Sequence, residues 1–254
     1  LEKTGRAPLR FSASAPKVPS GVPAGSPPPA TVAGKERPPV LVIDPQDTLF
    51  SDVLRLRYNG APGRFHRAHS CVEALLDMER VGPNVIILRD SAAQADEFVS
   101  KIKIERGKSL VSVIKIYGTG SDPHRQRSFK IWENDFFLEP FDVSELYALT
   151  EMELARVSGD RWRLAFQTLY RFTATEANLE RAAKLMRDLL AQSGLAEDLR
   201  TSLFAAFKEA VDNAVRHGNR HSPTKSIEVS FTGDPEQVTL EVAEESIQKR
   251  RLRY

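Results

Sequence analysis

An α/β domain followed by an α+β domain is the architecture that this sequence predicts. Between residues 39 and 157, short apolar runs alternate with segments of helical periodicity, which is the order of a doubly wound parallel sheet. From residue 163 onward the order becomes strand, helix, helix, strand, strand. A chain of 254 residues with 41% hydrophobic residues is long enough to bury a core in each domain.

The composition excludes several classes of protein. A formal net charge of +2 is too small to argue for binding to nucleic acid. The lone Cys71 rules out an internal disulfide framework and fits a reducing compartment. No apolar run is long enough to span a bilayer, and no signal peptide is recognisable, so we expect a cytoplasmic protein without a membrane anchor. Because the first residue is Leu, we expect a fragment of a longer chain.

Residues 1–38 are expected to form a disordered tail. The first 39 residues hold nine of the 16 prolines, together with many Ala, Ser and Gly residues. Such a composition offers little for a periodic apolar face and favours a flexible linker.

The segment 39–157 is predicted to build the parallel sheet. Its first helix should present Leu49, Phe50, Val53 and Leu54 to the core. The expected strands cover 40–43, 65–68, 85–88, 111–116 and the run that begins at 135, and further helices cover 71–80 and 142–157.

The wording of this segment resembles the receiver domain of response regulators, above all in AHSCVEALL, GPNVIIL and FFLEPFDVSEL. The resemblance implies an acidic pocket with a phospho-accepting Asp after the third strand, a Ser or Thr after the fourth and a Lys on the fifth. Those three places hold Arg89, Tyr117 and Glu139, and Asp44 is the only acidic-pocket residue that remains. Asp90 is one residue late, which turns its side chain to the other side. We therefore expect a pseudo-receiver without a phosphoacceptor, used for contacts.

Arg89 and Glu139 carry the charges of the receiver's Asp and Lys with the signs exchanged. We predict an ion pair between them that joins the strand ends and excludes Mg²⁺. The alternative is two independent surface substitutions, which would contribute only about 0 to 1 kcal/mol.

After a hinge at 158–162, the segment 163–254 predicts an α+β domain. Thr173 and Glu176 have capping-box spacing, and Gly194 should end the helix that follows. Strands are expected at 164–172, 226–231 and 238–242, with a turn at 233–235 and helices at 179–190 and 199–219.

The helix at 199–219 carries two stripes. Its apolar face consists of Leu203, Phe207, Ala210, Val211 and Ala214. Glu209, Asn213 and His217 repeat every fourth residue and miss that face, at about 100° per residue. A solvated polar stripe on an amphipathic helix is the simpler interpretation.

The run EAVDNAVRHGN resembles the N-box of the histidine kinase-like (GHKL) ATPases, and its wording is closest to the anti-sigma-factor serine/threonine kinases. The resemblance implies that Asn213 holds the Mg²⁺ of Mg-ATP and that Glu209 orients or deprotonates the attacking hydroxyl. His217 and Glu244 would complete the nucleotide site, with Glu244 standing where the family has an Asp that reads adenine. The family's glycines and ATP lid do not follow, so we expect a C-terminally truncated domain. Weak binding of Mg-ATP and an unpaired sheet edge, with possible homodimers, should result.

Two functions follow from this pattern. The first is an ATP-dependent serine/threonine kinase of the anti-sigma type with a receiver-like input domain. The second is a binding module, a pseudo-receiver with a dead kinase fold, that sequesters a sigma factor or an anti-sigma antagonist. A sensor histidine kinase is a weaker third option, because no phospho-accepting histidine helix precedes residue 163.

Overall fold

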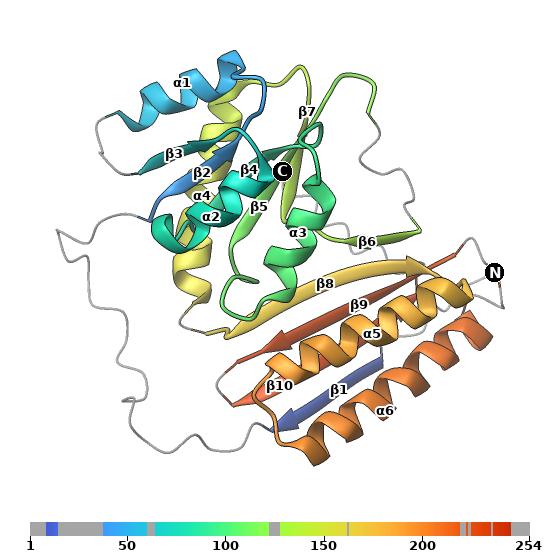
Figure 1. The fold of residues 1–254 in the computed structure, drawn as a ribbon. Helices are drawn as coiled ribbons and strands as arrows, with labels where there is room; N and C mark the ends of the chain where they lie inside the picture. The colour runs from blue at the N-terminus through green and yellow to red at the C-terminus, as the bar shows by residue number, and fades with distance from the viewer. Residues whose placement is uncertain are drawn as a thin grey trace, which may run out of the picture.

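The structure is a computed structural model that describes residues 9–14, 38–59, 64–121, 128–161, 163–218, 222, 225–234 and 236–244. Two five-stranded sheets, one parallel and one antiparallel, lie one beyond the other (Figure 1). Helices cover both faces of the first sheet and one face of the second. The α/β and α+β classes are therefore confirmed.

The parallel sheet has the order β3-β2-β4-β5-β7. Its strands are β2 (Val40–Ile43), β3 (Phe65–Ala68), β4 (Val85–Arg89), β5 (Ser112–Tyr117) and β7 (Asp135–Leu138). Numbered by their occurrence within this sheet, the strands run 2-1-3-4-5, which is the flavodoxin-like doubly wound order. All four strand pairs are parallel.

Alternate residues of each central strand enter different cores, because successive side chains point to opposite faces. Val85 and Ile87 of β4 join the core beneath α1 (Leu49–Tyr58) and α4 (Val143–Asp160). Ile86 and Leu88 join the core beneath α2 (Cys71–Val81) and α3 (Ala95–Ile104). Burial on both faces explains why these strands are mainly apolar in sequence.

The antiparallel sheet has the order β1-β10-β9-β8-β6. Its strands are β1 (Leu9–Ser14), β6 (Phe129–Ile131), β8 (Phe166–Thr173), β9 (Ser226–Gly233) and β10 (Gln237–Glu244). The helices α5 (Glu176–Gln192) and α6 (Glu197–Asn213) cover one face of this sheet, and the π-helix η1 (Ala214–Gly218) continues α6. The buried side chains of β8, alternating from Phe166 to Phe172, form the floor of this core.

Both edges of the antiparallel sheet are formed by strands that precede residue 163, where the C-terminal domain was predicted to begin. β1 pairs with β10 across six residues, although the composition predicts a disordered tail over 1–38. That prediction is wrong for Leu9–Ser14, and the remaining tail lies outside the described residues up to 37. The predicted unpaired edge is also wrong for β10, because β1 supplies its missing partner.

Several boundaries differ from the expectations. α4 runs to Asp160, so most of the predicted hinge at 158–162 is helical. The N-cap of α5 is Thr175 rather than Thr173, and its side chain makes no capping hydrogen bond. Leu49 is 78% exposed and does not belong to the apolar face of α1. α3 was not predicted, because only part of the segment that follows β4 is apolar.

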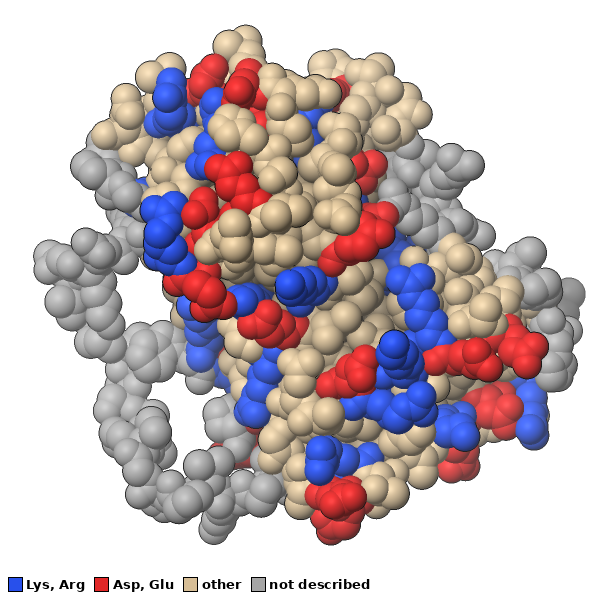
Figure 2. All heavy atoms as spheres, viewed as in Figure 1, with Lys and Arg blue, Asp and Glu red and all other residues tan. Residues whose placement is uncertain are grey.

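Acidic and basic side chains are interspersed on the face shown in Figure 2. Among the described residues, no helix combines the length and the apolar character needed to cross a membrane.

Candidate functional site

The polar stripe of α6 lies opposite the helix's buried face. Leu203, Phe207 and Ala210 are buried in the core between α6 and the sheet, as the periodicity predicts. Glu209 is exposed and Asn213 is half-buried, so both side chains remain accessible to a ligand. The helix therefore carries a packing function and an open polar surface at once.

The stripe does not continue as a regular α-helix. The backbone N–H of Ala214 points to the carbonyls of both Ala210 and Val211, and Ala214–Gly218 form a π-helix. Because a π-helix has wider turns than an α-helix, His217 does not follow Asn213 in α-helical phase. His217 is exposed at the end of this segment. Single π-turns are frequent at functional sites, so this irregularity is a second feature of the predicted site.

The fourth predicted nucleotide residue, Glu244, is the last residue of β10. Its backbone pairs with Ile227 of β9, and its side chain lies outside the described residues. The structure thus places Glu209 and Asn213 on one helix end, and it does not define the adenine side of the site.

Magnesium fits the residues of α6 only together with a nucleotide. The part of the chain that the structure describes holds no group of three or more His, Cys, Asp or Glu side chains able to bind a metal ion. Mg²⁺ usually keeps waters and takes one or two protein oxygens plus substrate phosphates. The half-buried amide of Asn213 can supply one such oxygen. The ion would neutralise phosphate charge, and Asn213 would position it.

Asp44, at the carboxyl end of β2, is fully buried and is engaged locally. Its carboxylate accepts hydrogen bonds from the backbone N–H and the hydroxyl of Thr48, both at 2.7 Å, and from the N–H of Gln46 at 3.4 Å. Burial by itself would raise the pKa of Asp44, but these hydrogen bonds outweigh it and hold the pKa below its usual value. The carboxylate therefore fixes the turn that leads into α1.

Arg89 and Glu139 form the predicted ion pair. The Nη2 atom of Arg89 lies 3.0 Å from Oε1 of Glu139, which confirms the prediction from the exchanged charges. The guanidinium also lies 6.0 Å from the ring centre of Phe50 on α1. A cation thus occupies the strand end where the receiver pattern has its carboxylate, and the pair links β4 to the end of β7.

Asp90 lies on the other side of the sheet, as strand alternation predicts. Its carboxylate is 2.8 Å from Nζ of Lys115, and Asp96 at the start of α3 is equally close to the same atom. The side chain of Lys115 is only 1% exposed. Sequence analysis missed this cluster, although a lysine within the apolar run SVIKIY was a visible signal.

Residues 172–253 match the family model of the histidine kinase-like ATPase domain. The C-terminal domain is a histidine kinase-like ATPase domain. The match extends to residue 253, beyond the end of β10. No curated protein sequence matches the chain significantly.

Solved receiver domains resemble the N-terminal half. The signal receiver domain of a putative Luxo repressor protein from Vibrio parahaemolyticus is 18% identical, with a TM-score of 0.40, and covers 49% of this chain and 95% of its own. The receiver domain of an HD-domain protein from Pseudomonas fluorescens is 19% identical, with a TM-score of 0.42, and covers 53% and 98%. A putative response regulator from Chloroflexus aurantiacus is 20% identical, with a TM-score of 0.38, and covers 46% and 97%. The receiver-like fold of our chain rests on its own strand order.

The receiver-like domain donates an edge strand to the ATPase sheet. β6 lies between β5 and β7 in sequence, yet pairs antiparallel with β8 through three residue pairs. Within this strand, Lys130 is 2.8 Å from a carboxylate oxygen of Glu133, and the hydroxyl of Tyr117 donates to the same oxygen at 3.2 Å. Burial and the nearby carboxylates raise the pKa of Tyr117. Tyr117 stands at the position of the receiver's Ser or Thr. Its hydroxyl therefore takes part in the contacts where the receiver-like domain joins the ATPase sheet.

Lys103 fastens the same junction from α3. Its buried ammonium group donates to the carbonyls of Ser109 at 3.2 Å and Val111 at 2.6 Å, and to Oδ1 of Asn134 at 2.7 Å. Its own carbonyl accepts from the hydroxyl of Thr168 on β8 at 2.7 Å. Burial lowers the pKa of Lys103 to about 7, while three oxygen acceptors match the three N–H donors of the charged form.

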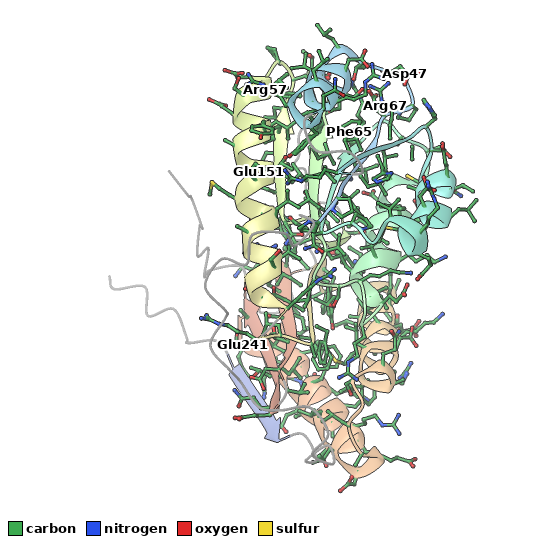
Figure 3. All side chains as sticks on the ribbon, turned by 90° about the vertical axis from the view of Figure 1, so that its left-hand side faces the viewer. Asp47, Arg57, Phe65, Arg67, Glu151 and Glu241 are labelled. Atoms are coloured by element: carbon green, nitrogen blue, oxygen red, sulfur yellow. The ribbon has the colours of Figure 1, made fainter. Side chains whose placement is uncertain are left out.

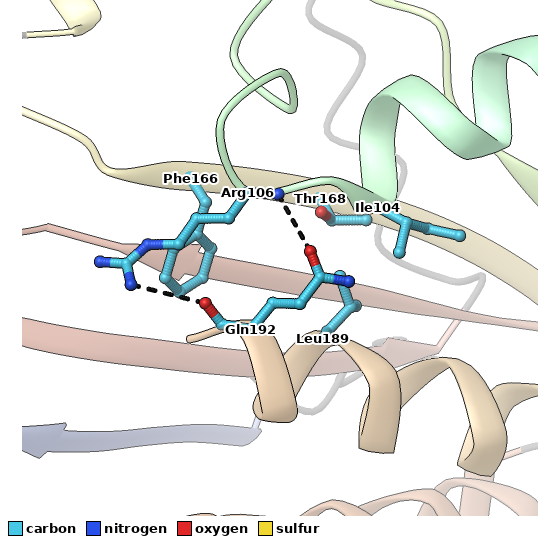
Figure 4. A pocket seen from close by; sticks show the side chains of 6 residues that line it. All are labelled: Ile104, Arg106, Phe166, Thr168, Leu189 and Gln192. Carbon is cyan, nitrogen blue, oxygen red and sulfur yellow. Dashed lines mark hydrogen bonds between the residues drawn. The ribbon is translucent and has the colours of Figure 1, made fainter. Parts of the chain in front are cut away.

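A small hollow beside this junction is shown in Figure 4. Arg106 donates from its backbone to Oε1 of Gln192 at 3.3 Å and from Nη1 to the Gln192 carbonyl at 3.4 Å. The hollow is lined by Ile104, Arg106, Phe166, Thr168, Leu189 and Gln192. Neither Glu209 nor Asn213 is among its lining residues, so it belongs to the domain interface.

Proposed function

We propose that this is a cytoplasmic bacterial signalling protein related to the anti-sigma-factor serine/threonine kinases. In this proposal the ATPase domain binds Mg-ATP through α6 and supports protein phosphorylation in the full-length form. The receiver-like domain regulates it by contact, without being phosphorylated. The expected partner is a sigma factor or an anti-sigma antagonist, and a homodimer fits the same scheme.

The observation that carries the proposal is the accessible polar stripe on α6. Glu209 and Asn213 lie four positions apart on a helix whose opposite face is buried in the core. Phosphoryl transfer depends mainly on positioning and charge neutralisation, and a rigid helix can hold an amide for the metal and a carboxylate for the hydroxyl in fixed register. The family match over 172–253 supports nucleotide binding in general.

The Arg89–Glu139 pair supports regulation by contact. Acyl phosphate formation requires a carboxylate at the strand end and Mg²⁺ beside it. Arg89 places a guanidinium there, already paired with Glu139. In this proposal the ion pair takes the place of a phosphorylation site, and the receiver-like domain acts through its contacts.

The second candidate function is a non-catalytic binding module that acts by sequestration. Glu244 in place of the adenine-reading Asp, and the missing glycines after β10, favour it. In that case the ATPase fold would serve as a surface for the partner.

Titration with a fluorescent ATP analogue, with and without Mg²⁺, distinguishes the two functions. We expect weak, Mg²⁺-dependent binding, with a Kd of about 0.1–1 mM, because α6 can hold only the phosphate end. Asn213→Ala should abolish it. Asp212→Ala is the matched control, since Asp212 is the preceding, exposed residue and pairs only with Arg216 in the contacts that we describe. An absence of Mg²⁺-dependent binding, or equal binding by both variants, would favour the sequestration module.

A further inference from the structure

The outer edge of β10 is covered by a strand from the far N-terminus. β10 pairs with β9 on one side and with β1 on the other, antiparallel in both cases. The register with β1 runs from Leu9 opposite Val242 to Ser14 opposite Gln237. Without β1 this edge would present a row of unpaired backbone groups, which is a template for another strand.

The register matches the chemistry of the two strands. Leu9, Phe11 and Ala13 stand opposite three residues of β10 that are all buried in the ATPase core, namely Val242, Leu240 and Val238. Arg10 stands opposite Glu241, which Figure 3 places on the side of the sheet away from α5 and α6. Directly opposite residues interact across an antiparallel pair, and opposite charges there are favourable. The edge therefore selects for apolar residues at alternate positions and for a cation at one register position.

The sequence of β1 resembles a run that begins in a strand of the same sheet. Arg10–Ser14 reads RFSAS, and 171–175, whose first three residues end β8, reads RFTAT. Each Ser in the first run corresponds to a Thr in the second. The N-terminal segment thus resembles a natural strand of the same sheet, including the alternation that its register requires.

We propose that the outer edge of β10 is a strand-binding site for extended peptides of the β1 pattern, and that Leu9–Ser14 is its tethered and displaceable occupant. This site is independent of the proposed nucleotide function. Its ligands are extended segments with apolar residues at alternate positions and Arg opposite Glu241. The main-chain hydrogen bonds supply affinity and the register positions supply specificity, as in other additions of a strand to a sheet edge.

The covalent tether determines how strongly β1 competes with a free peptide for the edge of β10. Residues 15–39 join β1 to β2, so β1 is covalently tethered to the chain whose sheet it extends. A tethered strand competes with an effective concentration on the order of 1 mM. A free peptide at micromolar concentration therefore cannot displace β1 from the intact chain, but it binds once β1 is weakened or drawn away.

The test is fluorescence anisotropy with a labelled peptide of residues 7–16, on the full chain. Phe11→Asp weakens β1 while it leaves the edge of β10 intact, and we expect this variant to bind the peptide at least about tenfold more tightly than the wild-type chain. Adding Glu241→Arg should weaken binding of this peptide. A peptide with Arg10→Glu should restore binding to that double variant.

A disulfide gives a second measurement that does not depend on the Phe11 variant. Ser12 and Thr239 are register partners, so Ser12→Cys with Thr239→Cys, in a Cys71→Ser chain, should form an intramolecular disulfide when oxidised with diamide. The oxidised chain should bind no peptide. Failure of this disulfide to form would overturn the proposal. Equal peptide affinities for the wild-type and Phe11→Asp chains would also overturn it, as would no binding by a folded Phe11→Asp chain.

Discussion

Replacing the partners of the Arg89–Glu139 pair tests whether this contact stabilises the receiver-like domain. With 3.0 Å between Nη2 and Oε1, the gross attraction is about 332/(20 × 3.0), or roughly 6 kcal/mol, at an effective dielectric constant of about 20. Desolvation offsets most of it, since the Arg89 side chain is 10% exposed and that of Glu139 is 27% exposed. We therefore expect a coupling energy of about 1–2 kcal/mol, above the usual value for surface pairs.

The measurement is a double-mutant cycle of Arg89→Met and Glu139→Gln, with urea unfolding followed by tryptophan fluorescence. A coupling below about 0.3 kcal/mol is what independent sites give, and would refute the reasoning. A charge exchange provides a stricter version. Arg89→Asp alone should destabilise the domain more than Arg89→Met, because it places a carboxylate beside Glu139. Arg89→Asp combined with Glu139→Lys should recover most of the loss.

Two further predictions concern packing and pH. A Cβ atom at Gly233 would overlap the ring of Phe166, so Gly233→Ala should lower the free energy of unfolding, measured in urea, by about 1–3 kcal/mol. The control Gly159→Ala lies in an open helical position and should raise the free energy of unfolding. Equal effects of the two variants would contradict the predicted overlap with Phe166. Burial lowers the pKa of Lys103 to about 7, so between pH 7 and 10 the unfolded state holds a proton that the folded state releases. The stability of the wild-type chain relative to Lys103→Met should therefore rise with pH, with a slope approaching about 1 kcal/mol per pH unit, whereas a difference that does not change with pH would exclude this titration.

The parallel sheet could be predicted closely because its signal is local. Each central strand is an apolar run, and helical periodicity follows it, so burial on both faces is visible in the sequence itself. The same holds for α6, where the predicted apolar face is the buried one. Strands and helices whose own residues show a clear apolar pattern were therefore placed correctly.

The strands β1 and β6 could not be predicted, because they are defined by partners far away in sequence. β6 has only three residues, and β1 lies in a segment dominated by proline, alanine and serine. A strand this short carries too little periodicity to be recognised, and pairing in a sheet depends strongly on context. The buried role of Lys103 was hidden for the same reason, since three separate segments supply its acceptors.

The candidate site was predicted in part. Arg89 and Glu139 were recognised as partners because a family pattern identified two distant positions whose charges were exchanged, and the structure brings them together. Glu209 and Asn213 were noticed from their spacing along one helix, and their nucleotide roles were inferred from the resemblance to the N-box and stay predictions. The π-helix that follows them was not foreseen from the sequence.

The two edge strands come from outside the segment 163–254. This limits how the gene can be split into segments that each encode a complete domain. A gene segment that encodes residues 163–254 alone would deliver the ATPase sheet without β1 and β6. Domain shuffling normally exchanges units whose boundaries few contacts cross. Here the backbone hydrogen bonds of a single sheet cross the boundary twice, at opposite ends. The two domains should therefore be exchanged during evolution as one unit.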